Sequence, residues 1–540
     1  MGLYLNSRRG YTLYQNIATS NYFVDKTKIL TELIPLMNTS ANCVCITRPR
    51  RFGKTVMANM IAAFLGKGVD SADIFHQLEI AQSELYQAHL NAHNVIFIDF
   101  SRASSGCNSY AQYMGKINEK LIKDLLAEFP DSEIDGNQDA LDILTEIFEY
   151  YGNVKFTFVL DEWDAPFHMK FMTNADKYDY LLFLKTLIKD QPYVEFAYMT
   201  GILPIAKYSS GSELNMFIEF TMTTQHKFSH YFGFTQSEVD ALYHEYLEKT
   251  ENPNFTLEEL GYWYNGYLTA SGERVYNPRS VVAALNNNKI GSYWTSSGPY
   301  DEIFYYIRHN IADVRNDLAL MTAGEAVPAR VQEYAAVSQN LTTKDEIFSA
   351  MVVYGFLSYD KGRVFIPNKE LMDKFDDMLL KEQSLGYVYN LAKKSEQMLA
   401  ATLAGDTATM SEILEYAHNT EVPMLSYNSE TELAAIVNLV YLAARDFYDV
   451  RREDKAGKGY VDFIFYPKYD TAADCVILEL KINNTADEAI RQIKDRNYAL
   501  RFRGKLGETP TYTGRILAVG IGYYKEEKRH ECKVEVISAE

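Results

Sequence analysis

The sequence predicts an α/β protein with three parts: a parallel sheet flanked by helices, a mostly helical middle region, and a smaller α/β unit at the C-terminal end. Over roughly the first 220 residues, short apolar runs alternate with helical stretches, and this repeat is typical of a parallel sheet. The runs are rich in Val, Ile and Phe and apolar on both faces, as buried strands are. They occupy residues 42–47, 94–101, 154–162, 194–201 and, less regularly, 216–223.

The pattern changes after the expected sheet. Thr235 and Glu238 form a capping-box pair that starts a helix, and the chain then stays mostly helical to residue 380. Residues 344–368 predict a helix followed by two short strands around an Asp-Lys-Gly turn, which suggests a winged-helix-like lid. The expected parts are a parallel-sheet domain, a helical lid, a helical connector and a C-terminal α/β domain, at residues 1–230, 231–380, 381–425 and 426–540.

Composition narrows the function classes. The net charge of −19 excludes a general nucleic-acid coat, so any nucleic-acid contact must come from a local basic patch. The five cysteines form no Cys-x-x-Cys pair, which argues against a disulfide framework or a zinc site and favours a reducing compartment. The first residues lack the apolar core of a signal peptide, and the apolar stretch 432–444 is too short to span a bilayer. We therefore expect a cytoplasmic protein without a membrane partner.

Residues 48–55 match the end of the phosphate-binding pattern G-x-x-x-x-G-K-[ST], but Arg48 stands where the pattern has its first glycine. Gly53, Lys54 and Thr55 lie between an expected strand and an expected helix, which is the required context. Amides at the start of that helix would face phosphate oxygens, Lys54 would bring its charge to the β- and γ-phosphates, and Thr55 would bind Mg²⁺. The stretch predicts a nucleotide site.

Two acids end the apolar run 154–162, where such a site needs them. Asp161 would hold Mg²⁺ through water, and Glu162 would be the general base that polarises the attacking water. The alternative is a pair of acids that caps a strand end. Thr200, after the next expected strand, is either a sensor of the γ-phosphate or a plain turn residue. Arg50 and Arg51 either contact phosphates or an acidic partner, or remain solvated in the turn.

Six stretches taken together resemble the bacterial AAA-ATPase-like family. They are residues 22–30, 47–55, 160–167, 199–207, 232–239 and 264–281. The resemblance covers nearly the whole chain and implies an N-terminal P-loop ATPase domain, with ATP and Mg²⁺ as its cofactors. A PD-(D/E)XK nuclease-like domain often follows in that family. The arginine-rich loop is then the family's own form of the Walker A motif.

The C-terminal acids fit that second domain. Asp462 lies in one expected strand, and Glu479 and Lys481 lie in the next, where alternation puts both on one face. Two carboxylates suit Mg²⁺, and a lysine beside the metal can orient or deprotonate a water. This is the D…E-x-K core of the PD-(D/E)XK nucleases, and the alternative is a surface salt bridge. Glu432, Gln492 and Tyr498 lie where this superfamily often carries an extra acid and a Gln/Tyr pair.

A basic cluster follows the motif and is the expected site of backbone phosphate contact. The alternative is the solvated face of a helix. The cluster comprises Arg491, Lys494, Arg496, Arg501, Arg503 and Lys505, with Tyr498 and Phe502 between them.

We therefore interpret the chain as an ATP-hydrolysing enzyme with a metal-dependent nuclease domain, whose nucleotide state controls cleavage. Nucleic acid is the expected partner of the C-terminal domain, with DNA favoured over RNA, and a homo-oligomer is compatible with this function. Two alternatives remain. One is a STAND-like signalling or remodelling ATPase whose C-terminal domain binds nucleic acid without cutting it. The other is an interaction module with an idle nucleotide site, which would leave Lys54 and Asp161 without a role.

Overall fold

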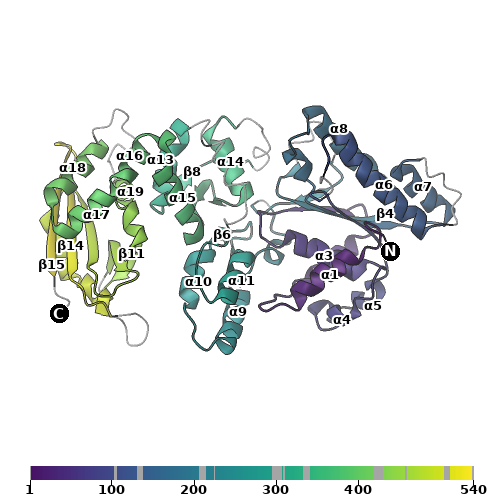
Figure 1. The fold of residues 1–540 in the computed structure, drawn as a ribbon, viewed down its shortest axis with the longest axis horizontal. Coiled ribbons are helices and arrows are strands. Elements are labelled where there is room, and N and C mark those ends of the chain that lie inside the picture. The colour runs from purple at the N-terminus through teal and green to yellow at the C-terminus, as the bar shows by residue number, and fades with distance from the viewer. Residues whose placement is uncertain are drawn as a thin grey trace.

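The structure is a computed structural model that describes residues 2–102, 106–130, 138–205, 214–223, 225–294, 307, 311–332, 341–418, 430–456, 459–503 and 511–537. The molecule is elongated, with an N-terminal sheet and its helices at one end, the C-terminal sheet at the other, and a middle region between them (Figure 1). Among the described residues, none of the helices combines the length and the apolar character that crossing a membrane requires.

The N-terminal sheet is parallel throughout, as predicted, with the strand order β2-β3-β4-β1-β5 in the described chain. Its strands are β1 (Cys43–Thr47), β2 (Asn94–Asp99), β3 (Phe156–Asp161), β4 (Val194–Gly201) and β5 (Ile218–Phe220). Since β1 lies between β4 and β5, and β3 lies beside β4, the carboxyl ends of these strands meet at one edge of the sheet, where ligands of α/β folds bind.

Helices cover both faces of this sheet (Figure 1). Apolar residues of α3 (Lys54–Leu65) pack against one face, and α3 is buried almost all round because α1 (Arg8–Ala18) covers its outer side. The opposite face packs against α6 (Tyr110–Glu128), α7 (Ala140–Tyr150) and α8 (Asn174–Ile188). The shorter helices α2, α4 and α5 span Leu30–Leu33, Ala72–Phe75 and Leu85–His89.

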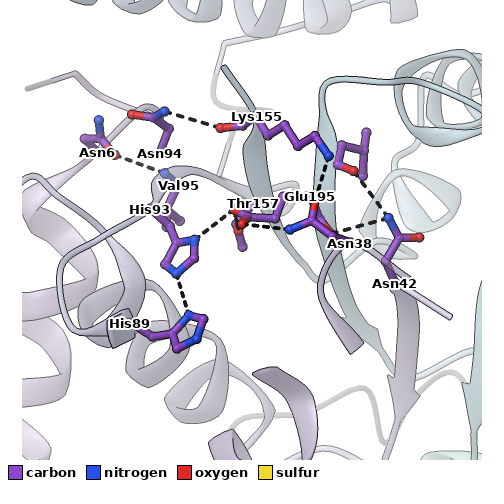
Figure 2. Close-up of polar contacts among 11 residues, drawn as sticks. Asn6, Asn38, Asn42, His89, His93, Asn94, Val95, Lys155, Thr157 and Glu195 are labelled. Carbon is purple, nitrogen blue, oxygen red and sulfur yellow. Dashed lines mark hydrogen bonds and ion pairs between the residues drawn. The ribbon is translucent and has the colours of Figure 1, made fainter. Parts of the chain in front are cut away.

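A polar network ties together the amino ends of the strands, at the edge opposite the loop between β1 and α3 (Figure 2). His93 Nδ1 lies 2.8 Å from Glu195 Oε2, and His93 Nε2 lies 2.9 Å from Nδ1 of His89. Thr157 Oγ1 and Asn38 Nδ2 also donate to the Glu195 carboxylate, each at 3.3 Å. The network therefore joins β3 and β4 to the chain segment that leads into β2.

We expect Glu195→Gln to lower the free energy of unfolding by about 2 kcal/mol, because it removes the charge that accepts these hydrogen bonds. Burial alone would raise the pKa of Glu195, but the hydrogen bonds from His93, Asn38 and Thr157 outweigh it and lower the pKa. The contribution is thus present at neutral pH and is lost as the pH falls below the ordinary value of 4.5.

Urea unfolding followed by fluorescence measures this effect, with Glu149→Gln on the exposed side of α7 as the matched control. The difference between Glu195→Gln and the wild type should shrink under acid conditions, as the wild-type carboxylate takes up its proton. A difference that stays constant from pH 7.5 to about pH 3.5, well below the ordinary value, would contradict this account of the network.

The middle region, residues 236–381, is mostly helical, as expected. Its helices are α9 (Gln236–Lys249), α10 (Leu257–Tyr264), α11 (Pro278–Asn287), α13 (Ile311–Thr322), α14 (Lys344–Tyr354) and α15 (Lys369–Lys381). The predicted capping box at the start of α9 is formed by Thr235 and Glu238. The short strands β6 (Tyr267–Leu268) and β7 (Arg274–Val275) pair with each other.

The predicted hairpin follows α14 as β9 (Ser358–Asp360) and β10 (Arg363–Phe365), with Lys361 and Gly362 at positive φ in the turn. A strand that the sequence pattern did not indicate, β8 (Val327–Pro328), pairs with the outer side of β10. The winged-helix-like part therefore has a small antiparallel sheet in the order β8-β10-β9.

The C-terminal sheet is mixed and has the order β11-β12-β13-β14-β15, with β13 and β14 parallel. Its strands are β11 (Tyr448–Ala456), β12 (Gly459–Pro467), β13 (Cys475–Ile482), β14 (Ile516–Tyr524) and β15 (Arg529–Ile537). One face packs against α20 (Ala486–Asp495) and the turn Tyr498–Arg503. The other face packs against α18 (Thr407–His418) and α19 (Glu430–Val440), and α16 (Tyr387–Lys393) and α17 (Ser395–Ala404) pack against these two helices (Figure 1).

Two features of this unit differ from the sequence-based prediction. Helix α19 ends at Val440, and a 3₁₀ turn at Leu442–Asp446 leads into β11, a strand that the sequence pattern did not indicate. The connector predicted at 381–425 contributes α18, which packs along β15. Part of the connector therefore lies on the C-terminal sheet, and the domain boundaries at 230, 380 and 425 stay predictions.

Candidate nucleotide and nuclease sites

The loop between β1 and α3 holds Lys54 at its centre. The Nζ of Lys54 donates to the carbonyl oxygens of Arg48 and Pro49, each at 2.9 Å. Burial lowers the pKa of Lys54 to about 8, and the charges of Asp164, Glu162 and Asp161 oppose that shift. Gly53 has a φ of 88°, and a Cβ at Gly53 would meet nothing within 4 Å, so the backbone conformation favours glycine here.

Arg48, which replaces the first glycine of the motif, has a structural place in the fold. It is 2% exposed, and its Nη1 donates to the carbonyl oxygens of Thr47 and Phe220 at 2.8 Å each. Its guanidinium also lies 5.0 Å from the centre of the Phe232 ring. The side chain thus turns away from the loop and joins the ends of β1 and β5.

The structure brings Asp161 and Glu162 to the edge of the sheet beside Lys54 and Thr55. Asp161 is fully buried, and neither carboxylate oxygen has a hydrogen-bond partner among the described residues. The Thr55 hydroxyl lies close enough to lower the pKa of Asp161 but lacks the geometry of a formed bond. Burial dominates and raises this pKa to about 7, with the charges of Asp99 and Glu162 adding to the shift.

Glu162 follows directly in a left-handed conformation, with a φ of 51°, which is uncommon for a residue with a side chain. Burial raises the pKa of Glu162, Lys54 and Arg50 oppose this, and Asp164 and Asp99 reinforce it. The side chain therefore lies among several charges at the edge of the sheet. A carboxylate with a raised pKa in such a place is chemically suited to accept a proton.

Thr200 lies at the same edge, opposite Asp161 in the strand register. Its hydroxyl is buried and donates to the carbonyl oxygen of Ile46 at 2.9 Å. This bond ties β4 to β1. The structure thus places Thr200 close to the loop but commits its hydroxyl to the sheet.

Two acids at this edge were not identified from the sequence. Asp99, at the end of β2, pairs with Asp161 in the register and accepts a hydrogen bond from Arg9 at 2.7 Å. Asp164 accepts from the amides of Ile202 and Leu203 and so holds the turn after β4. The available signal for Asp99 was its place at the carboxyl end of an apolar run, as for Asp161.

Gly201, at the end of β4, lies close to the side chains of the acid-bearing turn. A Cβ at Gly201 would lie 2.5 Å from Asp164 Oδ1 and 2.5 Å from Cδ1 of Trp163. A larger residue at position 201 would therefore force these two side chains to shift.

The middle region touches the loop directly. Trp294 Nε1 donates to the carbonyl oxygen of Arg50 at 3.3 Å. A Cβ at Gly355 would lie 2.6 Å from Pro49 Cβ, so the end of α14 closely approaches the loop. The position of Trp294 is itself fixed, because its amide donates to the buried carboxylate of Glu370 at 2.6 Å.

Further contacts bring aromatic and charged residues of the middle region to the loop. The Phe52 and Tyr267 rings meet edge to face at 4.9 Å. Burial lowers the pKa of Arg51, and the positive charges of Arg279 and Arg50 lower it further. The charge of Arg279, which lies at the start of α11, is therefore near that of Arg51.

In the C-terminal sheet, β12 and β13 separate where the candidate acids stand. Their pairing ends at Phe463 and Leu478, and the next residues are Asp462 and Glu479. In place of the next bond between the strands, the amide of Leu480 donates to Asp462 Oδ2 at 2.7 Å. The fork between the two strands thus brings both carboxylates next to each other, beyond the last paired residues.

Glu479 is the more buried of the two acids, at 3% exposure. Gln492 and Lys481 both donate to its Oε1, the lysine Nζ at 3.2 Å, while its Oε2 is buried without a partner in the described chain. Burial raises the pKa of Glu479 to about 7, and the Asp462 charge adds to the shift while Lys481 opposes it. The predicted Asp462, Glu479 and Lys481 therefore do come together, with Gln492 beside them.

Asp462 has a raised pKa for related reasons. Burial is the main cause, the Leu480 amide and Lys481 oppose it, and the charge of Glu430 reinforces it. Glu430 is the first residue of α19, the helix that also carries the expected Glu432, and its charge is among those felt at Asp462. Tyr498 donates to the carbonyl oxygen of Tyr460 and positions the start of β12.

The residues present fit divalent metal in both places. Asp161 and Glu479 each carry buried carboxylate oxygen without a partner in the described chain, and a cation would offset that cost. Among the described residues, no group of three or more His, Cys, Asp or Glu side chains is arranged to hold a metal. A Mg²⁺ ion, which usually keeps several waters, suits such sparse sites better than a cation that needs a full set of protein ligands.

The basic cluster is partly where it was expected. Arg491, Lys494 and Arg496 are exposed on or just after α20, and Lys494 pairs with Glu535 of β15. Arg501 Nε donates to the Tyr466 hydroxyl at 2.9 Å. The side chain of Arg503 and all of Lys505 lie outside the described residues. The aromatic residues Tyr498 and Phe502 are core residues, at 1% exposure each.

Comparison with known proteins gives two family matches. Residues 8–210 match a family described as predicted AAA-ATPase, and residues 428–528 match the PD-(D/E)XK nuclease superfamily. No curated protein gives a significant match.

Several solved structures are similar to this chain at low sequence identity. The match to a Walker-type ATPase of Pyrococcus abyssi covers 65% of this chain and 94% of that protein, with 11% identity and a TM-score of 0.37. The match to the ORC2 protein of Aeropyrum pernix, in its ADPNP and ADP complexes, covers 69% of this chain and 95% of that protein, with 13% identity and a TM-score of 0.32. The match to a STAND protein with a tetratricopeptide-repeat sensor from Pyrococcus horikoshii covers 78% of this chain and 53% of that protein, with 14% identity and a TM-score of 0.23.

Both family matches coincide with the two sites described above. The first contains the loop 48–55 and the edge with Asp161, and the second contains the fork with Asp462 and Glu479. The chain thus joins a domain of the AAA-ATPase-like family, at residues 8–210, to a domain of the PD-(D/E)XK nuclease superfamily, at residues 428–528.

Proposed function

We propose that this chain binds and hydrolyses ATP with Mg²⁺, and that its nucleotide state controls Mg²⁺-dependent cleavage of nucleic acid by the C-terminal domain. One observation carries the proposal: each site pairs a lysine with a buried carboxylate that has unpartnered oxygen in the described chain. Lys54 stands beside Asp161, and Lys481 stands beside Glu479. Such an arrangement is costly unless a cation is bound, and two of them in one chain support two metal-dependent reactions.

In the ATPase domain, the proposed roles follow the edge of the sheet. Gly53 and the following amides would bind phosphate, with Lys54 adding charge and Thr55 and Asp161 holding Mg²⁺. Glu162 would take the proton of the attacking water, which its raised pKa supports. Arg50 and Arg51 would neutralise phosphate charge. Thr200 would act mainly by tying β4 to β1, because its hydroxyl is committed to Ile46.

In the C-terminal domain, Asp462 and Glu479 would hold Mg²⁺ at the fork between β12 and β13. The metal would supply Lewis-acid stabilisation of the phosphate. Lys481 would orient or deprotonate a water, and Gln492 would hold Glu479 in place. The fork is suited to this task because both carboxylates stand beyond the last paired residues.

Control by nucleotide requires a physical connection, and the middle region supplies one. It meets the loop through Trp294 and Gly355, and it meets the C-terminal domain through the ion pair between Asp376 of α15 and Arg445. We accordingly propose the expected division into ATPase domain, lid, connector and nuclease domain. The five cysteines form no disulfide, which supports a reducing compartment such as the cytoplasm.

The exposed basic residues of α20 are proposed to contact the phosphate backbone. Changing Arg491, Lys494 and Arg496 together to Gln should weaken binding of a labelled DNA duplex about tenfold at low salt and flatten the dependence of log Kd on log salt. Fluorescence anisotropy between 50 and 200 mM salt, roughly the range over which such contacts weaken most, measures both. The ATPase rate without DNA serves as the control and should not change. An unaltered slope would assign these residues to a solvated helix face.

The proposed function is tested with purified full-length protein, Mg²⁺ or Mn²⁺, and plasmid, linear duplex or single-stranded nucleic acid, with and without ATP. We expect ATP hydrolysis and nucleic-acid cleavage, both abolished by EDTA. DNA binding without cleavage under any metal and nucleotide would instead favour a STAND-like ATPase whose C-terminal domain only binds.

A further inference from the structure

An ion pair connects the middle region to the edge of the candidate nuclease site. Glu325 lies between α13 and β8, and its Oε1 accepts from both Nη1 and Nη2 of Arg452, each at 3.3 Å. Arg452 lies on β11, and its guanidinium stands 5.5 Å from the centre of the Phe463 ring. Phe463 is the last residue of β12 that pairs with β13, so this arginine lies at the rim of the fork, where the pairing of those two strands ends.

Arg452 also lies next to the fork in the strand register, where it stands opposite Phe463 of β12. Both partners of the ion pair are also accessible: the side chains of Arg452 and Glu325 are 20% and 29% exposed. A ligand at the fork could therefore reach the guanidinium if Glu325 moved away.

The fold fixes the position of Glu325. Gly324 ends α13 with a φ of 89°, and the amide of Glu325 donates back to the carbonyl oxygen of Leu320 at 3.1 Å. On the other side, Arg363 of β10 donates from Nε to the carbonyl oxygen of Ala326 at 3.1 Å. The carboxylate is thus presented to Arg452 by a helix cap and by the β8-β10-β9 sheet.

The chemistry of this pair resembles the recognition of phosphate. A guanidinium presents a planar fork of donors that fits carboxylate or phosphate oxygens, so a carboxylate can stand where a phosphate would bind. Two bonds of 3.3 Å to a single oxygen, in partly exposed side chains, are weak and readily exchanged. A second negative charge at the rim would also repel an approaching nucleic-acid backbone.

We propose that Arg452 binds a backbone phosphate of the nucleic acid at the nuclease fork, and that Glu325 of the middle region occupies Arg452 and so restrains the site. The inference rests on the proposed nuclease function, whose regulation it specifies. Arg452 is then a substrate-binding residue, and Glu325 is an internal competitor for its guanidinium.

The same sheet leads toward the nucleotide loop. β8 pairs with β10 through Val327 and Val364, and β10 pairs with β9, which follows α14. The turn after α14 holds Gly355 against Pro49 of the loop. A movement of the winged-helix-like part that follows nucleotide binding would therefore move Glu325 relative to Arg452. This continuity shows where coupling can run, and the experiment decides whether it does.

The test measures binding of a short fluorescein-labelled DNA duplex to the full-length protein by anisotropy, with Ca²⁺ in place of Mg²⁺ to suppress cleavage. Glu325→Gln should bind about three- to tenfold more tightly than the wild type, and Arg452→Ala about tenfold more weakly. In the Arg452→Ala background, the gain from Glu325→Gln should nearly vanish, because the competitor has lost its target. Asp474→Asn, which breaks an ion pair with Arg515 in the same domain, should leave the affinity unchanged.

Parallel assays with Mg²⁺ separate the failure of this inference from failure of the proposed function. Equal affinities of the wild type, Glu325→Gln and Arg452→Ala would overturn the inference, even if the wild type cuts DNA and Asp462→Ala does not. A tighter Glu325→Gln, with no cleavage by any variant under Mg²⁺ or Mn²⁺, would overturn the nuclease function and leave the pair as a control of binding. Circular dichroism melting of each variant checks that a change of affinity does not reflect unfolding.

Discussion

Asp462→Ala and Glu479→Ala are each expected to lower nucleic-acid cleavage by at least about 1,000-fold, because either change removes a carboxylate from the proposed metal site. Lys481→Ala should cause a similar loss for a different reason, since its ammonium is not a metal ligand. Calorimetric titration with Mn²⁺ distinguishes them: binding at the fork should be lost in both acid variants and retained in Lys481→Ala.

All three variants should hydrolyse ATP at the wild-type rate, since their residues lie in a different sheet from the phosphate loop. Asp495→Asn, an exposed acid at the end of α20, is the matched control and should cut normally. Retention of cleavage by Glu479→Ala would contradict the assignment, because Glu479 carries the buried oxygen without a partner in the described chain.

Glu162→Gln is expected to slow ATP hydrolysis by about 100-fold or more while ATP still binds, because the amide keeps the shape but cannot accept a proton. Lys54→Ala should instead weaken ATP binding, since the ammonium at the centre of the loop is lost. A fluorescent ATP analogue measures affinity, and phosphate release measures turnover. Wild-type turnover by Glu162→Gln would show that another group is the base.

The pH dependence gives a second measurement on the same residue. Burial raises the pKa of Glu162, and a general base works only when it is deprotonated. The wild-type rate should therefore fall on the acid side at a pH above the ordinary carboxylate value of 4.5. This acid limb should be absent from the residual activity of Glu162→Gln.

The sequence was most informative where strands are buried on both faces. The runs that became β1, β2, β3 and β4 are apolar over most of their length, and each ends within two residues of its predicted limit. The edge strand β11 was missed because its sequence is rich in charged residues, such as Arg451 and Arg452, which a strand paired on one side can leave partly exposed. The two-residue strand β8 is too short to leave a pattern.

The candidate sites show a similar limit. Asp161, Glu162, Asp462, Glu479 and Lys481 could be predicted because each stands at a fixed place in or just after an apolar run. Residues that reach these sites only through the strand order, or through contacts between regions, could not be predicted from the sequence. Asp99 reaches Asp161 only through the pairing of β2 with β3, and Glu325 reaches Arg452 across more than a hundred residues of sequence.

Arg48 illustrates why a motif can change without losing its loop. In the phosphate-binding pattern this position is glycine, yet here the side chain leaves the loop and donates to the carbonyl oxygens of Thr47 and Phe220. The spacing of the motif could not reveal which way the Arg48 side chain points, because its partner Phe220 lies in β5, far along the chain.

The central claim, that nucleotide state controls the nuclease, is tested most directly by the DNA cleavage rate of Glu162→Gln and Lys54→Ala with and without ATP. Glu162→Gln, held in the ATP state, should cut at a rate that differs from the wild type when ATP is present. Lys54→Ala should be shifted in the opposite direction and be insensitive to ATP. Wild-type cleavage rates for both variants, with and without ATP, would contradict the claim.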